Sequence, residues 1–522
     1  MSAIVEAAPA LPINPAEWSY LAEGGFHIIL RYDGNDPELM GQILRIGKKA
    51  LGHQEEKGGD GGGGAAAPAV VAPDEAGARR KFERGVLIPL LGEQYVQPGD
   101  AVMLSREDIE KIHDSIDHLR PAGRIKKDVG DWSSACQLEP DKTAFWLKVA
   151  SATHGAVTPG TSEEGGDKKA VVMAVEVKPK GAVMPVGTLV PPGNNRLKYR
   201  VARFDAQQRF KAQGKQSWGS IDRPCLYHPR EFYSGDAKRA ASTLKELMKT
   251  PQNKLRAWEN GNMLFGAGSG KGHDEGAAEE ALGKAVVEAG LAGEDGTPAE
   301  ALMDLVGEIL AREPLVSRLV AAQALDVLEV EGGGMVFDKL VSLCGGSTEE
   351  ALNMLEDQES EGFEAEPISD DLLVPAATLE ALRAGSPLAA GGKDGGNIDE
   401  LHAKGLLAVE KLSVEDCVQL LRRYIIALGV MDCSVMMSLV LAPAPAPAAT
   451  AAEDGDEPAQ SSSLQGKRAA GVFQTPDGRR VAYCVSVVDA GPKPPTKLSK
   501  KAKHEDEIWD FVAGLEDAGE VI

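Results

Sequence analysis

Short apolar runs recur along the 522-residue chain and predict β-strands. Residues 170–177 form a continuous apolar run, and residues 430–440 form a mostly apolar run with one acid near its start. Both patterns are typical of strands that are buried on both faces. Residues 472–488 indicate two strands joined at a Pro-Asp-Gly turn, and residues 18–51 indicate two more, joined through Asp33-Gly34. The apolar runs that end near residues 177 and 488 meet charged residues there, so charge is expected at the ends of buried strands.

Other stretches repeat their apolar residues at helical spacing. Residues 105–119 predict a helix, because Ser105 can cap it, Asp108 follows three residues later, and isoleucines recur at helical intervals. Further helices are expected at residues 203–215, 240–248 and 413–428, and the Ala/Leu/Glu-rich stretch 276–356 is helical by its period. The chain is therefore expected to contain helices as well as strands.

Glycine and proline divide the chain into parts. The 59 glycines and 31 prolines concentrate in a few tracts, a composition typical of loops and linkers. We expect a disordered insertion at residues 55–75 and flexible insertions at residues 266–300, 357–399 and 441–470. Because 522 residues exceed what one small core requires, two lobes are predicted, at residues 1–157 and 170–522.

The formal net charge of −23 argues against non-specific binding to nucleic acid or to acidic membranes. An anionic small molecule remains possible as a ligand, because a local cluster of Lys and Arg sets the field where it binds. The six cysteines are scattered without a Cys-x-x-Cys pair, which favours an intracellular compartment, cytoplasmic or nuclear. No signal peptide is expected at residues 1–15. The apolar run 425–442 is interrupted by Asp432 and indicates buried core rather than a membrane span.

One glycine-rich segment, Gly266-Ala-Gly-Ser-Gly-Lys271, superficially suggests a P-loop. Phe265 stands where the first glycine of that motif is needed, and Gly272 stands where Ser or Thr is needed. Because no strand-then-helix pattern surrounds it, we interpret the segment as a flexible loop.

A second glycine pair, Gly24-Gly25, precedes a predicted strand. Turns of this kind let main-chain N–H groups approach phosphates, as in kinase glycine-rich loops. Arg45, on the following strand, could aim a cation at the same phosphates. An ordinary tight turn is the alternative interpretation.

Two acids lie at the ends of predicted strands. Asp489 ends the strand near residue 488 and is followed by Lys493 and Lys497, and Asp432 lies at the start of the run 430–440. Buried strands rarely carry a carboxylate without a cation or a metal. Phosphoryl transfer to a hydroxyl needs such a pair, one carboxylate to accept the proton and one to hold Mg²⁺, with lysines to offset phosphate charge. Structural aspartates in salt bridges are the alternative.

Several segments, in order along the chain, resemble the inositol-pentakisphosphate 2-kinases, in particular plant and algal members. The segments are Glu23-Gly24 with the strand to Leu30, Ile43-Leu-Arg45-Ile, Leu91-Gly-Glu-Gln-Tyr-Val-Gln-Pro-Gly99, Glu176-Val-Lys178-Pro-Lys180, Tyr227-His-Pro-Arg-Glu-Phe-Tyr-Ser-Gly235, Pro251-Gln-Asn253 with Arg256, Asp432-Cys-Ser, and Asp489 with Lys493-Pro494. No single segment is specific, but the ordered series is. The resemblance implies an α+β, two-lobed fold, distantly protein-kinase-like, with an N-terminal nucleotide lobe and a C-terminal inositide lobe.

The resemblance also implies a reaction and residue roles. The reaction would be ATP- and Mg²⁺-dependent phosphorylation of the 2-hydroxyl of inositol 1,3,4,5,6-pentakisphosphate to inositol hexakisphosphate (phytate). By this likeness Asp432 is the catalytic base, Asp489 the Mg²⁺ ligand, and Lys180 faces the transferred phosphoryl group. Nucleotide contacts are implied for Gly24, Gly25, Arg45, Glu176, Lys178, Asn253 and Arg256. Inositide contacts are implied for Arg124, Lys180, Lys211, Lys493 and Lys497.

The chain also departs from the family pattern. The departures are Ala22, His27, Gln207, Lys254, Gly491 and Lys501. Those at Ala22, His27 and Gly491 suggest, as an alternative, a weakened relative that binds inositol phosphates or nucleotide without efficient turnover. A non-catalytic acidic scaffold is a third hypothesis. Plant members hold a structural zinc with two His and two Cys, but residues 330–357 offer only Cys344, so no structural zinc is expected. A monomer is expected, without nucleic acid or membrane insertion.

Overall fold

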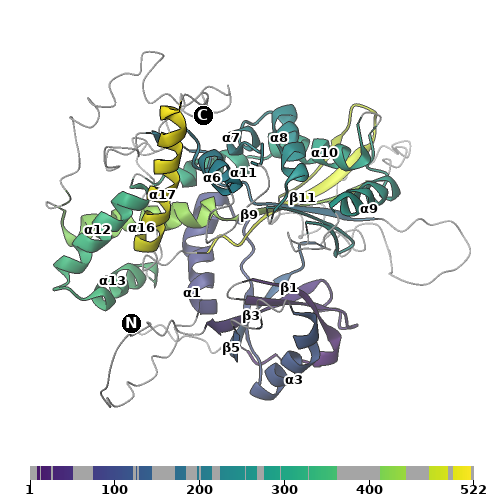
Figure 1. The fold of residues 1–522 in the computed structure, drawn as a ribbon. Coiled ribbons are helices and arrows are strands. Elements are labelled where there is room, and N and C mark those ends of the chain that lie inside the picture. The colour runs from purple at the N-terminus through teal and green to yellow at the C-terminus, as the bar shows by residue number, and fades with distance from the viewer. Residues whose placement is uncertain are drawn as a thin grey trace, which may run out of the picture. The chain divides into compact units, whose positions relative to one another are not determined.

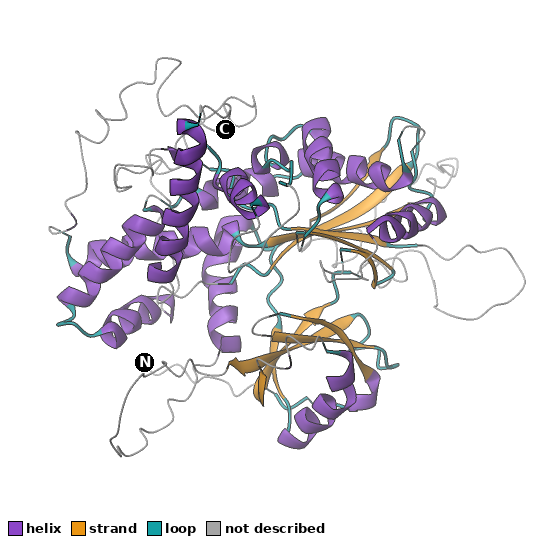
Figure 2. Ribbon diagram, in the orientation of Figure 1, coloured by secondary structure: helices purple, strands orange, loops and turns teal. Residues whose placement is uncertain are grey.

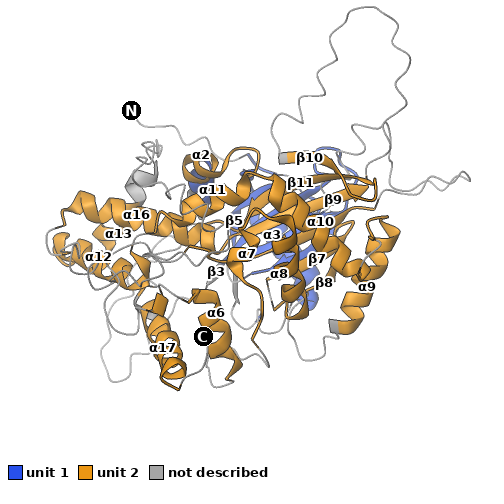
Figure 3. Ribbon diagram, turned by 90° about the horizontal axis from the view of Figure 1, so that it is seen from above, with its two compact units in different colours: residues 1–84, 97–157 blue, residues 85–96, 158–522 orange. Residues whose placement is uncertain are grey.

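The computed structural model describes residues 9–11, 13–24, 27–50, 75–120, 125, 128–143, 171–183, 197–198, 201–213, 224–252, 254–266, 275–293, 296–326, 328–360, 409, 412–441, 469–491 and 498–518. The chain divides into two compact units, coloured separately in Figure 3. Unit 1 contains Met1–Arg84 and Gln97–Val157, and unit 2 contains Gly85–Val96 and Thr158–Ile522. The expected insertions at residues 55–75 and, for the most part, 357–399 and 441–470 lie outside the described residues.

Unit 1 is built on an antiparallel sheet with the strand order β1-β2-β3-β5-β4. The strands are β1 (Trp18–Glu23), β2 (His27–Tyr32), β3 (Gln42–Ala50), β4 (Asp100–Met103) and β5 (Asp128–Pro140). The predicted helix appears as α3 (Arg106–Ile116), extended by the 3₁₀ turn η3 (Asp117–Leu119), and the Ser105 hydroxyl accepts the main-chain N–H of Asp108 as expected of a cap. Its isoleucines pack on the sheet, in a core that also holds Trp18, Leu30 and Trp132. Strand β1 was not predicted; it pairs with β2 across the turn that contains Gly24.

Unit 2 is built on a second antiparallel sheet, with the order β10-β11-β9-β6-β7-β8. The strands are β6 (Met173–Val177), β7 (Leu255–Glu259), β8 (Asn262–Phe265), β9 (Ser434–Leu441), β10 (Ala469–Gln474) and β11 (Arg480–Val488). The central strands β6 and β9 are buried almost throughout, which confirms what their mostly apolar runs predict. Two antiparallel sheets together with separate helical segments make this an α+β fold.

Helices make up most of the rest of the described chain (Figures 1 and 2). They are η1 (Pro15–Glu17), α1 (Glu75–Phe82), the π-helical turn η2 (Glu83–Leu87), α2 (Ile88–Leu91), α6 (Arg203–Ala212), α7 (Pro229–Phe232), α8 (Ala237–Lys249), α9 (Glu275–Glu288), α10 (Pro298–Arg312), α11 (Leu315–Gln323), α12 (Glu329–Leu343), α13 (Thr348–Ser360), α16 (Val414–Met431) and α17 (Leu498–Asp517). Helices α8 and α10 lie side by side, with Gly307 against the main chain of α8. Helices α12, α13 and α16 share one apolar core.

Two sequence-based boundaries are wrong. Residues 266–300 were expected to be a flexible insertion, although the helical period was recognised from residue 276 onward. The helical prediction is the correct one there, because α9 contains Leu282 and Val286, which recur at helical spacing and are fully buried. Residues 85–96, expected in the N-terminal lobe, belong to unit 2, where the Tyr95 hydroxyl donates to Glu313 and the Tyr95 carbonyl accepts the N–H of Val487.

None of the described helices combines the length and apolarity that crossing a membrane requires. The six cysteines, all among the described residues, are buried and form no disulfide.

Candidate active site

The charged residues that follow or precede the central strands of unit 2 meet at one edge of its sheet. Val488 at the end of β11 pairs with Ser434 at the start of β9, and Val177 at the end of β6 pairs with Val435. Because β9 runs antiparallel to both neighbours, its first residues and their last residues share an edge. Lys178, Lys180, Asp432 and Asp489 therefore lie together, as the sequence predicts.

Asp432 was expected at the start of a strand over residues 430–440, but the strand begins only at Ser434. Helix α16 continues to Met431, three residues beyond its expected end, and Asp432 is its C-cap residue, in the turn before β9. The helix is longer because a capping box at Ser413 fixes its start and its buried apolar residues continue at helical spacing as far as Val430. The turn leaves the Asp432 side chain half exposed, whereas the strand that follows is buried.

Each aspartate is paired with one lysine from the end of β6. The Lys180 ammonium nitrogen lies 2.8 Å from Asp432 Oδ1, and the Lys178 nitrogen lies 3.8 Å from Asp489 Oδ2. Cys433 lies among these four charges, but burial raises the pKa of its thiol to about 12. The thiol is therefore protonated at neutral pH, and the chemistry available at this edge belongs to carboxylates and ammonium groups.

Glu176 and Arg256 are opposite one another on β6 and β7 and form an ion pair. Glu176 is buried, and its two carboxylate oxygens accept hydrogen bonds from Ser434 Oγ at 2.6 Å and from the Arg256 guanidinium at 3.2 Å. Arg256 Nε is buried and has no hydrogen-bond partner among the described residues. Glu176 is the last but one residue of β6 and Arg256 is the second residue of β7, so the pair lies one residue inside this edge of the sheet, next to the four charges.

A cluster of cations extends this edge, and one of its members was not predicted. Lys211, in the last turn of α6, has its pKa lowered by burial and by the charges of Arg203 and Lys180. Lys254 is 5% exposed and lies over the Phe204 ring, and burial together with Lys211 and Lys180 lowers its pKa to about 7. Among the described residues, no carboxylate forms an ion pair with Lys254. Lysines this close to one another are typical of a site that binds an anion.

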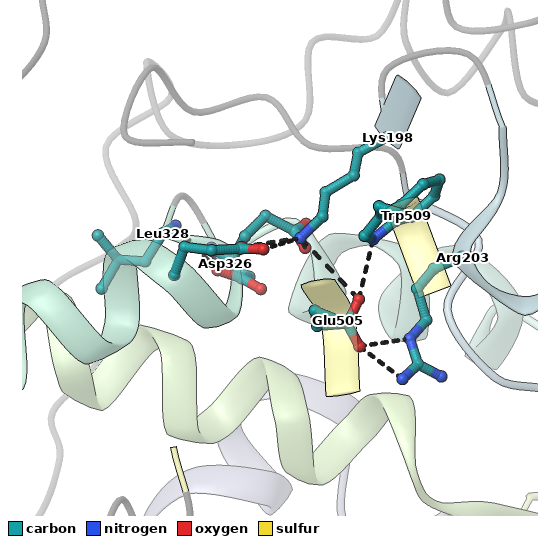
Figure 4. A network of polar contacts seen from close by, with 8 residues as sticks. Lys198, Arg203, Asp326, Leu328, Glu505 and Trp509 are labelled. Carbon is teal, nitrogen blue, oxygen red and sulfur yellow. Dashed lines mark hydrogen bonds and ion pairs between the residues drawn. The ribbon is translucent and has the colours of Figure 1, made fainter. Parts of the chain in front are cut away.

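Helix α6 is anchored from its other end by a polar network in which Lys198, Glu505 and Trp509 are buried and Arg203 is partly exposed (Figure 4). Glu505 of α17 accepts two hydrogen bonds from Arg203, at the start of α6, and one from the indole N–H of Trp509. Lys198 lies 3.9 Å from the same carboxylate and donates to Glu331 at 2.6 Å. The network fixes the helix that carries Lys211. The sequence alone does not reveal this network, because its members are far apart along the chain.

Three non-glycine residues around these strand ends have left-handed main-chain conformations: Lys180 (φ 64°), Gln252 (φ 50°) and Asp489 (φ 58°). Such conformations cost of order 1 kcal/mol or more each and tend to cluster at functional sites. Gln252 accepts a hydrogen bond from the Lys254 ammonium and donates one to Gln208 at 2.7 Å. The strained positions therefore coincide with the charged edge.

In unit 1 the candidate nucleotide residues have partners of their own. The Gly24 N–H donates to the His27 carbonyl at 2.9 Å, and the Gly24 carbonyl accepts from Lys48 at 3.0 Å. Arg45 is buried and donates to Glu139 at 2.9 Å. Burial opposes ionisation of Glu139, but Arg45 and two neighbouring cations lower its pKa to about 2. Five candidates lie outside the described residues: Gly25, Arg124, Asn253, Lys493 and Lys497.

The two aspartates at this edge suit Mg²⁺, which needs few protein ligands, better than a metal that protein side chains enclose completely. No group of three or more His, Cys, Asp or Glu in the described residues gathers as a metal cage. Mg²⁺ commonly takes one or two carboxylates and completes its shell with water and substrate phosphates. Asp489, which is 40% exposed, fits such a role.

Comparisons with known proteins all identify the same family. The family model described as inositol-pentakisphosphate 2-kinase matches residues 20–507. The inositol-pentakisphosphate 2-kinase of Arabidopsis thaliana is 26% identical over 333 residues, 61% of this chain and 68% of that protein. The rice enzyme (Oryza sativa subsp. indica) is 25% identical over 62% of this chain and 69% of its own. The Danio rerio enzyme is 30% identical over 35% of this chain and 33% of its own.

Proposed function

This chain belongs to the inositol-pentakisphosphate 2-kinase family, and we propose that it transfers the γ-phosphoryl group of ATP to the 2-hydroxyl of inositol 1,3,4,5,6-pentakisphosphate. The product would be inositol hexakisphosphate. Family membership makes the chain a phosphotransferase. The particular hydroxyl, the product and the residue roles are the proposal.

One observation carries the proposal: two half-exposed aspartates, one before β9 and one after β11, are each paired with a lysine that follows β6. A purely structural salt bridge needs one acid and one cation, and it does not need neighbouring lysines that depress one another's pKa. Lys211 and Lys254 bring further positive charge to this edge, and burial together with cationic neighbours lowers the pKa of both. A polyanionic substrate would offset that charge.

In the proposed mechanism Asp432 accepts the proton of the inositide hydroxyl. The new bond between that oxygen and the γ-phosphorus forms as the bond to the bridging oxygen of ADP breaks. Lys180, which hydrogen-bonds Asp432 at 2.8 Å, has two further N–H groups for the transferred phosphoryl oxygens. Asp489 would hold Mg²⁺, which offsets the charge of the nucleotide phosphates when bound.

The remaining cations would orient the inositide. An unpaired phosphate beside a partly buried surface is costly, and each charge-assisted hydrogen bond contributes about 1.5–3 kcal/mol. Several lysines are therefore needed to hold the hydroxyl toward Asp432. Contacts from Lys493, Lys497 and Arg124 to the inositide, and from Gly24, Gly25, Arg45, Glu176, Lys178, Asn253 and Arg256 to the nucleotide, belong to the same proposal. So do the distantly kinase-like fold and a monomeric state.

The test is to incubate the full chain with ATP, Mg²⁺ and inositol pentakisphosphate and to separate the products by anion-exchange chromatography. We expect inositol hexakisphosphate from the wild type and at least a 100-fold lower rate from Asp432→Asn and Asp489→Asn, since both remove groups used in the transition state (on the order of 10²–10⁴-fold for a general base). Wild-type turnover no faster than that of these variants, with inositide binding retained, would instead support the weakened relative that the departures at Ala22, His27 and Gly491 suggested.

A further inference from the structure

Lys180 reaches Asp432 from a main-chain conformation that a lysine rarely adopts. Its φ is 64°, in the left-handed region, where a side chain crowds its own carbonyl and the conformation is disfavoured without support. The main-chain pairing of β6 continues one residue past the strand, where the Lys178 N–H donates to the Lys254 carbonyl at 2.8 Å, and Lys180 lies beyond it in a turn outside the described strands. Some other group must stabilise this turn.

Three buried side chains from other parts of unit 2 hydrogen-bond the main chain of this turn. The Tyr227 hydroxyl donates to the Pro179 carbonyl at 2.9 Å, and the Tyr233 hydroxyl donates to the Lys180 carbonyl at 3.0 Å. The Gln323 amide nitrogen donates to the same Lys180 carbonyl at 3.3 Å, and its oxygen accepts the Ala182 N–H at 3.0 Å. The Gln323 side chain thus bridges the two residues on either side of Gly181.

The contacts form a closed set. The Gln323 amide nitrogen also donates to the Tyr233 hydroxyl at 2.8 Å, so its two N–H groups and its oxygen all have partners. Both tyrosines and Gln323 are at most 3% exposed. Burial raises the pKa of both tyrosines well above the usual range, so both hydroxyls keep the proton that they donate. Buried polar networks in which every member is satisfied specify one geometry strongly.

We propose that Gln323, with Tyr233 and Tyr227, is a positioning residue for the phosphoryl-transfer site: it holds the main chain of Lys180 in its left-handed conformation and so delivers the ammonium group to Asp432. This inference rests on the proposed function of Asp432 and Lys180. None of the three side chains touches the reacting groups. Each acts through the carbonyls of the turn, while the Lys180 side chain stays about a quarter exposed and open to a ligand.

The experiment compares Tyr233→Phe and Gln323→Met with the wild type. Both changes keep the apolar volume and remove donors to the Lys180 carbonyl. We expect kcat to fall about 10- to 100-fold with a smaller change in KM for ATP, since small misplacements of reacting groups have effects of this size. The acid limb of the pH profile of kcat should also move to higher pH, because Asp432 loses the cation that favours its ionised form. Loss of stability alone would leave that limb in place.

A matched control is Tyr483→Phe, which also removes a hydroxyl bonded to a protein group, the Glu313 carboxylate at 2.7 Å. It should leave both kcat and the acid limb unchanged. If Gln323→Met does not fold, Tyr233→Phe carries the comparison. A kcat and acid limb equal to wild type in the folded variants would overturn the proposal.

A second measurement separates this proposal from the proposed function. The rate of reductive methylation of Lys180, followed by mass spectrometry of peptides, reports how firmly its ammonium is held, whether or not the protein turns over. We expect this rate to rise several-fold in Tyr233→Phe and to stay at the wild-type value in Tyr483→Phe. An inactive wild type with this pattern would refute the kinase proposal and keep the positioning role, whereas equal methylation rates in all three proteins would refute the positioning role.

Discussion

Lys254 should make inositide binding depend on pH in a way that one substitution removes. Its ammonium is almost fully buried beside Lys180 and Lys211, and its pKa is lowered to about 7. A phosphate placed against it would favour the charged form and raise the pKa again. Binding above pH 7 should therefore draw a proton onto the protein.

The size of the effect follows from the pKa. Above pH 7 the unbound protein loses the Lys254 proton, and each further pH unit should weaken binding up to tenfold, or about 1.4 kcal/mol, until the pH reaches the pKa of the complex. Below pH 7 the charge is present in both states. There Lys254→Met should weaken binding by about 10- to 100-fold, the equivalent of one charge-assisted hydrogen bond of about 1.5–3 kcal/mol.

The assay is isothermal titration calorimetry with inositol pentakisphosphate, without ATP, at pH 6.5, 8 and 9 in buffers of different ionisation enthalpy. The inositide phosphates titrate too, so the informative quantity is the difference in proton uptake between wild type and variant. At pH 8 we expect about one proton fewer for Lys254→Met and for Lys254→Arg. Exposed Lys249→Met is the control and should match wild type. Equal uptake in wild type and Lys254→Met would refute the reasoning, and so would an affinity gap that does not narrow toward pH 9.

The same lysine gives a stability prediction with a definite sign. At pH 6 both the folded and the unfolded chain carry the Lys254 proton, so the folded chain bears the full cost of burial and of its cationic neighbours. Between pH 7 and the usual lysine pKa near 10.5 the folded chain sheds the proton first, and the cost declines. Lys254→Met should therefore raise the Tm of the ligand-free protein most at pH 6, and scanning calorimetry that finds a larger gain at pH 9 would contradict this.

Two further substitutions test how the site is supported. A methyl group at Gly429 of α16 would lie 2.9 Å from a carbonyl oxygen of the segment after β11. Gly429→Ala should therefore lower the free energy of unfolding, measured in urea, by about 1–3 kcal/mol. The control is Gly334→Ala, which has open space around it and should be neutral or slightly stabilising. Glu505→Gln should lower the free energy of unfolding by about 1–3 kcal/mol, because Lys198 and Arg203 lose the carboxylate that they share. The control is Glu507→Gln, on the exposed face of the same helix, which should have little effect. A Glu505 variant as stable as wild type would show that the network of Figure 4 does not anchor α6.

Much of the sheet in unit 2 could be predicted, because its central strands are mostly apolar runs and those of β6 and β11 end next to charged residues. Lys178 and Asp489 were placed correctly for that reason. Asp432 was not, because Val430 and Met431 suit a buried helix as well as a buried strand, and short apolar runs do not separate the two. Strand β1 was missed because its polar residues hide the alternation, and it is defined by pairing with β2.

Lys254 shows what sequence patterns do not reveal. A lysine after a turn is expected to be solvated, and only long-range packing, in which Phe204 of α6 lies against its ammonium group, brings Lys211 and Lys180 to it. The partners of Arg45 illustrate the same point in unit 1. Its position on β3 was predicted, but the buried Glu139 that it pairs with lies on another strand and is identified only by the pairing of β3 with β5.

The residues with left-handed main-chain conformations indicate which parts of the site are held rigidly and which stay available to a ligand. Lys180, Gln252 and Asp489 all adopt disfavoured main-chain conformations at the same sheet edge, and buried hydrogen bonds to the Lys180 carbonyl support one of them. The Lys180 side chain pairs with Asp432 at 2.8 Å but stays about a quarter exposed, and the Asp489 side chain is 40% exposed. Because buried groups hold the Lys180 turn through its main chain, its ammonium group can exchange partners when phosphates arrive without loss of the turn. A rigid main chain with available charged groups is what electrostatic stabilisation of a phosphoryl transfer requires.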